Sequence, residues 1–441
     1  MCLNHPAPPP PTSLARRGVL GAAMALVGAS AITGATGGIA AAAERTTHGS
    51  RDSRDSGAPR GTLVIEGGTL LDPLTGEVTE DSVVVIEDGV VTAAGSRNAT
   101  RAARAALPST VHVVAAHGKW VLPGLVDAHI HLNSLAEARA ALHQGATSVR
   151  SGSTNFYQDI ALRELARWAP EQVPGMRAAG VFVTPDLGDT ILADPDLAPL
   201  ARLKGGVTST EALRRVVQVN LERGVDVVKT RSNPRAGLAE QDPLQQVYTR
   251  EQLATVVAAA RKGGKGVLCH SYSETGCRDA VFAGVRSMEH GVFVTEDTLH
   301  EMSRRGTFFT PTIGAIAGMI GDADPILDER GRTYVPILQR AVRAAHDMGV
   351  PVAAGTDSAG GVVDPIGGEV VRMREAGLSV LDAIRTATTS AAELLGQSRS
   401  IGRLAKGFHG DAVLFDRSPL EDLTVLKTPS AVIHTGIAVT V

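Results

Sequence analysis

The stretch VLPGLVDAHIHL, residues 121–132, decides the fold. Its apolar run ends in His129 and His131, which one residue separates. Residues two apart on a strand point to the same side, so both imidazoles can face one interior and chelate one metal ion. The pattern predicts a buried strand that carries ligands at its carboxyl end, with a pair of structural histidines as the alternative.

Strand and helix patterns alternate beyond this stretch. Residues 210–224, TEALRRVVQVNLERG, place apolar side chains at i, i+3 and i+4 from Leu213, which predicts an amphipathic helix. Short apolar runs separate several such helices over residues 121–398. This alternation is typical of βα units and predicts an α/β fold with a (β/α)8 TIM barrel. In such barrels, the carboxyl ends of the strands form the active site.

Both flanks of this region carry a strand-rich pattern instead. Residues 62–120 include TLVIEGGTLLD and SVVVIEDGVVTAAG, and residues 399–441 include GDAVLFD and SAVIHTGIAVTV. β-Branched runs broken by Gly and Asp-Gly predict short antiparallel strands. We therefore expect a small β-sandwich domain that is formed from both chain ends, with the barrel inserted between them.

The first 43 residues have the features of an export signal. Arg16 and Arg17 precede the apolar run GVLGAAMALVGASAI, and the stretch ends in IAAAAER. A basic pair, an apolar run and an A-x-A site predict a signal peptide of the twin-arginine type, removed after residue 43. A membrane anchor is the alternative. Residues 44–61 are polar and predict a flexible linker. We expect an exported protein, extracellular or in the cell envelope, with no membrane span after processing.

Composition excludes a nucleic-acid partner. The 441-residue chain has a formal net charge of −3 and only 3% aromatic residues. Nucleic-acid-binding domains carry a strong positive excess, and proteins that bind single strands stack bases on aromatic rings. Three cysteines do not make a disulfide framework. The composition leaves a homo-oligomer open.

Further apolar runs end in side chains that can bind metal ions. Lys229 closes GVDVVK, His270 closes GVLCH, His290 closes VRSMEH and Asp357 closes VPVAAGTD. Burial disfavours a lysine cation, and a neutral amine can react with carbon dioxide to form a carbamate that bridges two metal ions. A lysine that reaches solvent is the alternative. Together with the two histidines of the first run, the set predicts two divalent metal ions, and its imidazoles favour zinc.

These motifs resemble the amidohydrolase superfamily. The resemblance rests on GLVDAHIHL, Lys229, His270, SMEHG and GTDS, and on GRLAKGFHGDAVLFD near the carboxyl end. It covers nearly all of residues 62–441. Within the superfamily, the chain is similar to the imidazolonepropionase-like branch, which includes Xaa-Pro dipeptidases and ochratoxin-hydrolysing amidases.

The resemblance implies how the ligands divide between the two metal ions. His129 and His131 would hold the more buried ion, and His270 and His290 would hold the outer one. Carboxylated Lys229 would bridge both.

The resemblance also implies a mechanism. A hydroxide between the metal ions would attack the carbonyl carbon of an amide or peptide bond in an acyl-amino acid or small peptide. Asp357 would bind the buried ion, act as general base and pass the proton to the leaving amine. The alternatives are hydrolysis of a cyclic amide, an imidazolone, a lactone or a phosphotriester, deamination, and a metal-free barrel without catalysis.

Three residues are candidates for contact with the substrate. The branch has a second histidine where this chain has Tyr272, two residues after His270 and on the same face of the strand. We expect the Tyr272 hydroxyl to polarise the scissile carbonyl, with a tyrosine that packs in the core or against a lid as the alternative. Arg231 and Arg235 lie in the polar stretch TRSNPRAGLAEQDPLQQVY. Either guanidinium can clamp a substrate carboxylate, and a solvated loop charge is the alternative.

A second departure concerns the support of the ligands. The branch often has VRD after its second strand, and this chain has Val149, Arg150 and Ser151 there. The sequence therefore leaves open which carboxylate, if any, orients the metal-binding imidazoles.

Overall fold

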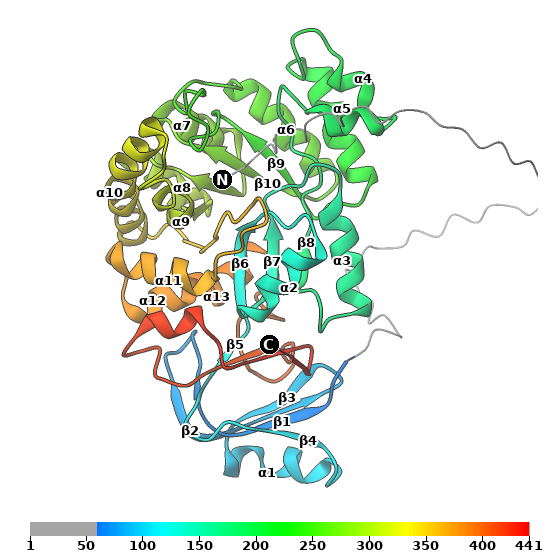
Figure 1. Cartoon of the computed structure of the whole chain (residues 1–441), viewed down its shortest axis with the longest axis vertical. Coiled ribbons are helices and arrows are strands. Elements are labelled where there is room, and N and C mark those ends of the chain that lie inside the picture. Colours follow the sequence, from blue (N-terminus) through cyan, green and yellow to red (C-terminus); the bar gives the residue numbers. More distant parts are fainter. Residues whose placement is uncertain (1–59, 441) are drawn as a thin grey trace, which may run out of the picture. The chain divides into compact units, whose positions relative to one another are not determined.

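One mixed sheet of eight strands is built from both ends of the chain, in a computed structural model that describes residues 60–440 (Figure 1). Its strands are β1 (Leu63–Leu71), β2 (Val78–Glu87), β3 (Val90–Ser96), β4 (His112–Ala115), β5 (Trp120–Pro123), β13 (Ala412–Phe415), β14 (Ala431–His434) and β15 (Ile437–Val439). The order is β15-β14-β13-β5-β1-β2-β3, and β4 also pairs with β1. Because β13 pairs with β5, the predicted joining of the two chain ends in one sandwich-like sheet is confirmed.

Local sequence explains this sheet. Asp88 and Gly89 connect β2 to β3, and their φ angles are +49° and +73°. A two-residue hairpin loop with both φ angles positive favours Asp-Gly. The sheet runs to Pro123, slightly beyond the predicted boundary at residue 120. The backbone nitrogen of Gly61 donates to the oxygen of Thr435 at 2.9 Å, so the sheet domain already includes the end of the predicted linker.

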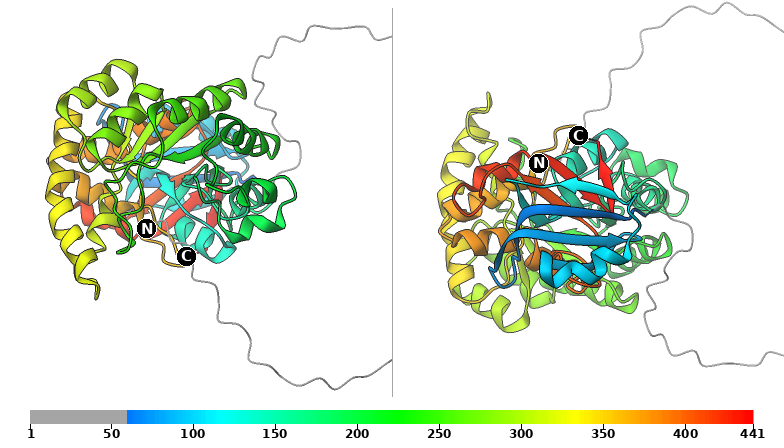
Figure 2. Two further views of the ribbon diagram at one scale, coloured as in Figure 1. Left: turned by 90° about the horizontal axis from the view of Figure 1, so that it is seen from above. Right: turned by 90° about the horizontal axis from the view of Figure 1, so that it is seen from below.

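Parallel strands fill the middle of the chain. They are β6 (Leu125–Ile130), β7 (Ala146–Ser151), β8 (Gly175–Arg177), β9 (Val227–Arg231), β10 (Gly266–Ser271), β11 (Ser287–His290) and β12 (Phe308–Thr310). They form a three-stranded sheet, β6-β7-β8, and a four-stranded sheet, β12-β11-β10-β9. Figure 2 shows helices packed around the outside of these strands.

Irregular segments connect the two parallel sheets. Val183 pairs with Thr230 of β9, and Val352 pairs with Phe309 of β12. The segment that contains Val352 also reaches β6, because the backbone nitrogen of Ala128 donates to the oxygen of Ala354 at 2.9 Å. Residues 350–358 therefore run beside both β12 and β6. The end of this segment, with Asp357, lies next to β6.

Helices follow most of the parallel strands along the chain. They are α1 (Arg97–Ala106), α2 (Leu135–His143), α3 (Gln158–Trp168), α4 (Ala198–Ala201), α5 (Thr210–Glu222), α6 (Arg250–Lys262), α7 (Glu274–Ala283), α8 (Glu296–Arg305), α9 (Ile313–Ala317), α10 (Pro325–Asp347), α11 (Ile366–Glu375), α12 (Val380–Thr386) and α13 (Thr389–Leu394). The amphipathic helix predicted at 210–224 is confirmed as α5, which begins after a Ser209 cap and buries Leu213, Val216 and Val217.

Two predictions concern the amino-terminal region. The predicted signal peptide, residues 1–43, and most of the predicted linker lie outside the described residues. Within residues 60–440, none of the helices combines the length and the apolar character that a membrane span requires.

Candidate metal centre

His129, His131 and Asp357 form a buried group that we call the inner triad. One potential ligand atom from each lies within 4.8 Å of the others. Oδ1 of Asp357 is 3.1 Å from Nε2 of His131 and 3.4 Å from Nε2 of His129. The register is fixed because the backbone nitrogen of Asp357 donates to the oxygen of His129 at 2.7 Å. Two imidazoles and a carboxylate are suitable ligands for a divalent transition metal.

Lys229 extends this group from β9. Its side chain is completely buried, and its Nζ lies 3.1 Å from Nε2 of His129. The ring of Phe182 lies 5.5 Å from the same Nζ. Lys229 therefore reaches the inner triad from the interior, as the sequence predicted, and does not extend to solvent.

His270 and His290 form a second group, which we call the outer pair. Their ring centroids are 4.4 Å apart, and the ring of His290 is 5.6 Å from that of His129. Nε2 of His270 lies 3.0 Å from the oxygen of Pro234. A donating Nε2 leaves Nδ1 of His270 as the nitrogen with a lone pair.

The hydrogen bonding and the protonation of His290 fit the role of a metal ligand. Its Nδ1 lies 2.7 Å from Oγ1 of Thr312, and its buried Nε2 has no hydrogen-bond partner among residues 60–440. Burial and the neighbouring His270 lower the pKa of His290 well below its usual range, so the ring is neutral. A neutral imidazole with an unpaired buried nitrogen is what a metal ligand requires.

Unusual backbone conformations aim these side chains. The φ angles of His290, Thr312 and Asp357 are +69°, +49° and +54°. Non-glycine residues in this left-handed region cost free energy, and such residues concentrate at functional sites. At His290 the conformation ends the alternation of β11, so Glu289 and His290 both contact the centre.

Glu289 is a functional residue that sequence reasoning missed. Its Oε2 lies 2.5 Å from Nδ1 of His129 and 2.9 Å from an amino nitrogen of Arg150. Burial opposes ionisation of Glu289, but the Arg150 guanidinium, His129 and Lys229 together more than offset this and lower the pKa of Glu289. Glu289 thus supplies the carboxylate that orients His129, and the arginine of the VRS stretch neutralises it.

Gly152 leaves open the space around the two histidines of the inner triad. A Cβ at this position would lie 2.6 Å from Nε2 of His129 and 2.6 Å from Nε2 of His131. We therefore expect Gly152→Ala to lower metal affinity at least about tenfold, as loss of ligand orientation does elsewhere. Metal titration of the purified protein measures this effect.

Gly175→Ala is the matched control for this prediction. Gly175 begins β8, which pairs with the strand that ends just before Gly152, and a Cβ at Gly175 would approach no atom closer than 3.6 Å. We expect it to bind metal like the unmodified protein. Equal metal affinity of the Gly152→Ala variant would show that the space beside the histidines is not needed.

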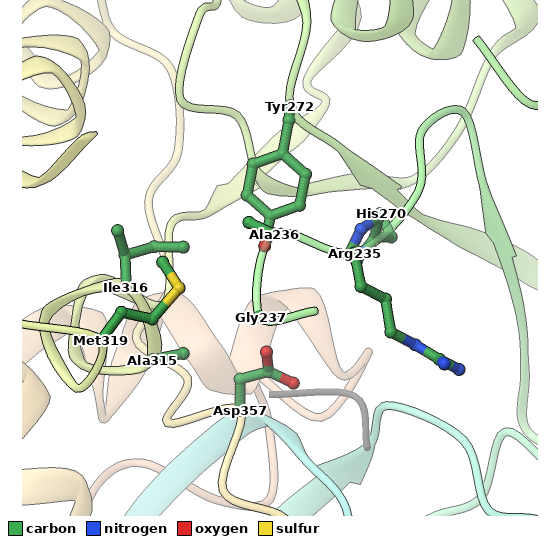
Figure 3. Close-up of a pocket in the computed structure, with 9 residues that line it drawn as sticks. All are labelled: Arg235, Ala236, Gly237, His270, Tyr272, Ala315, Ile316, Met319 and Asp357. Atoms are coloured by element: carbon green, nitrogen blue, oxygen red, sulfur yellow. The ribbon is translucent and has the colours of Figure 1, made fainter. Parts of the chain in front are cut away.

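A small, partly open pocket lies beside the ligands (Figure 3). Tyr272 and Asp357 point into it from opposite sides. The ring of Tyr272 stacks on that of His290 at 5.0 Å and meets His270 edge-on at 4.8 Å. Tyr272 therefore lies where the sequence placed it, between the outer pair and the open space. Ala315, Ile316 and Met319 give the pocket an apolar wall.

The two candidate arginines lie in different environments. Arg235 lines the pocket, and its buried Nε has no hydrogen-bond partner within the described part of the chain. Arg231 was predicted in a polar loop, and this placement is wrong. β9 continues to Arg231, which pairs with His270 of β10. Its guanidinium packs over the ring of Phe182 at 4.4 Å.

Comparisons with known proteins agree with this geometry. The amidohydrolase family matches residues 120–438. Ochratoxinase from Aspergillus niger is 24% identical over 422 residues, which cover 85% of each chain. The solved structure of a Xaa-Pro dipeptidase with bound methionine has a TM-score of 0.75 at 23% identity, and covers 86% of this chain and 99% of its own. A putative prolidase from Bifidobacterium longum has a TM-score of 0.74 at 24% identity, covering 86% and 95%.

The match in sequence assigns the chain to a family. The solved structures support the fold. The family match spans most of the chain, including the inner triad, Lys229 and the outer pair. The chain therefore belongs to the amidohydrolase family, as its motifs predicted, and is a metal-dependent hydrolase of carbon–nitrogen bonds.

Proposed function

We propose that this chain is an exported binuclear amidohydrolase that cleaves the amide or peptide bond of an acyl-amino acid or small peptide. The observation that supports it best is the convergence of the inner triad, Lys229 and the outer pair in one buried centre. In this proposal the parallel strands form a (β/α)8 barrel, and the ligands lie at the carboxyl ends of its strands.

Two divalent ions, zinc by the number of imidazoles, belong to this proposal. The inner triad would hold one ion, the outer pair would hold the other, and Lys229, as a carbamate, would bind both. When bound, the metal ions supply a water activated for attack at neutral pH. The neutral His290 and the carboxylate-oriented His129 are prepared for this role by their own contacts.

The residues around the centre supply the remaining chemistry. The Asp357 carboxylate accepts the proton of the attacking water and passes it to the leaving nitrogen. The Tyr272 hydroxyl donates a hydrogen bond to the scissile carbonyl, whose oxygen gains negative charge during attack. Both side chains line the same pocket, so one bound substrate can contact both.

The pocket favours a substrate with two different ends. Ala315, Ile316 and Met319 offer an apolar surface to an acyl group or side chain. Arg235 contributes a buried Nε that has no hydrogen-bond partner among residues 60–440, which suits a carboxylate. The similarity to ochratoxinase and to a Xaa-Pro dipeptidase supports amides of amino acids as the first compounds to screen.

Export is part of the proposal and rests on the sequence of residues 1–43. A mature amino terminus at residue 44 in the secreted protein would support it. Recovery of the intact chain from the cytosol alone would refute it.

Removal of metal tests the proposed chemistry. We expect elemental analysis to find about two divalent ions per chain in protein produced with zinc and bicarbonate. A chelator should abolish hydrolysis of N-acyl amino acids and Xaa-Pro dipeptides, and added zinc should restore it. One ion per chain, together with deamination or ring opening, would favour the mononuclear alternative. Metal-free protein under these conditions would favour a barrel without catalysis.

A further inference from the structure

Arg330 of α10 binds the backbone of the loop that follows β9. One of its amino nitrogens donates to the oxygens of Ala236 and Leu238 at 2.9 and 2.8 Å. The other donates to the oxygens of Gln241 and Ala239 at 2.7 and 3.5 Å. We call residues 233–241 the pocket loop. A single guanidinium thus satisfies four of its carbonyl groups, and hydrogen bonds from a charged donor are stronger than neutral ones.

The beginning of the pocket loop is tied to the residues that follow β10. Oδ1 of the buried Asn233 accepts from the backbone nitrogens of Tyr272 and Ser273 at 2.8 and 3.1 Å. Its Nδ2 donates to the oxygen of Gln245 at 2.8 Å and to Oγ of Ser273 at 2.9 Å. Asn233 therefore fixes the first residue of the loop to the segment that carries Tyr272.

Gly331, the next residue of α10, contacts the segment that forms the opposite wall of the pocket. A Cβ at Gly331 would lie 2.8 Å from the backbone nitrogen of Ile320 and 3.0 Å from the carbonyl carbon of Met319. The helix backbone therefore directly contacts the segment that follows α9 and carries Met319. Figure 3 shows Met319 and Ile316 across the pocket from Ala236 and Gly237. Adjacent residues of α10 thus support two facing walls.

We propose that Arg330 is a positioning residue that sets the distance between these walls and thereby selects the acyl group or side chain that the enzyme accepts. The inference rests on the proposed function. Residues 232–249 contain no helix or strand, so a loop of this length needs tethers to keep one conformation. The helix itself does not need Arg330, because Leu327, Leu338 and Val342 anchor it in the core.

The first test compares Arg330→Gln with Arg330→Lys. We expect Arg330→Gln to raise KM about tenfold to a hundredfold for substrates with a bulky apolar group, because small displacements of positioning elements have effects of this size. The ratio of kcat/KM between bulky and small acyl groups should fall. Arg330→Lys should restore part of this selectivity, since an ammonium can still donate to some of the carbonyl groups.

Metal content and thermal stability separate this role from a purely structural one. Metal content should stay unchanged in Arg330→Gln, and the melting temperature should fall only modestly, because the lost hydrogen bonds are confined to one loop. Arg332→Gln is the matched control, because Arg332 lies on the same helix and pairs with the exposed side of Asp328. Unchanged selectivity in Arg330→Gln, or a selectivity change that only follows a loss of stability, would overturn the proposal.

A second measurement does not require a known substrate. Hydrogen exchange of the metal-loaded protein should be faster in residues 233–241 of Arg330→Gln than in the unmodified protein or in Arg332→Gln. Faster exchange without turnover of any amide would leave Arg330 as the tether and refute the proposed function. Unchanged exchange would refute the tether itself, whatever the substrate is.

Discussion

Replacing Lys229 with alanine should lower the rate of amide hydrolysis about a thousandfold or more, which corresponds to about 4 kcal/mol of activation free energy. Lys229 is fully buried, and its Nζ lies 3.1 Å from His129 of the inner triad. In the proposed centre it is the ligand that joins both metal ions. Steady-state kinetics give the rate, and elemental analysis should show a fall from about two ions per chain to one.

The fold should survive this change. A buried amine carries a desolvation cost, so its removal partly offsets the loss of packing around it. We expect circular dichroism to remain native-like. Lys262→Ala is the control, because Lys262 is exposed at the end of α6. Full activity of Lys229→Ala would refute the carbamate.

Chemical rescue gives a second, independent measure. A small carboxylate such as formate presents two oxygens, as the carbamate would, and the alanine variant leaves space for it. We expect formate to restore part of the activity of Lys229→Ala and to leave the unmodified enzyme unaffected. Rescue by an amine of similar size, with none by formate, would show that a cationic side chain was the functional group.

Much of the candidate centre could be predicted from the sequence because its ligands end apolar runs. Residues two apart share one face of a strand, which predicted that His129 and His131 would act together. The same parity placed Tyr272 beside His270, and the structure stacks its ring on the outer pair. These predictions depend only on the alternation of side chains along a strand, which a short stretch of sequence is enough to predict.

The remaining features depend on conformations and contacts that short stretches do not reveal. Alternation along VRSMEH directs Glu289 away from His290, and only the positive φ angle of His290 brings both to the centre. Arg231 looked like a loop residue because nothing in TRSNPR marks where β9 ends. The contacts of Arg330 with residues 236–241 span about ninety positions of sequence and exist only in the folded chain.

The buried pair of Arg150 and Glu289 leads to the second large prediction. Arg150 donates to Glu289 at 2.9 Å, to Oγ of Ser287 at 2.7 Å and to the oxygen of Ala128 at 2.6 Å, and both charged side chains are almost completely buried. Glu289→Gln keeps the size of the side chain but leaves the guanidinium without its counter-charge. We expect the free energy of unfolding to fall by about 3–5 kcal/mol, measured by denaturant titration of the metal-free protein.

Two further variants separate the charge effect from the effect on the ligand. Asp347→Asn removes an exposed carboxylate that pairs with Arg343, and it should change stability little. Combining Glu289→Gln with Arg150→Met removes both buried charges and should recover much of the lost stability. Metal affinity should nevertheless stay about tenfold to a hundredfold weaker in the double variant, because His129 still lacks its carboxylate. Recovery of affinity together with stability would mean that Glu289 neutralises Arg150 and does not tune the metal ligand.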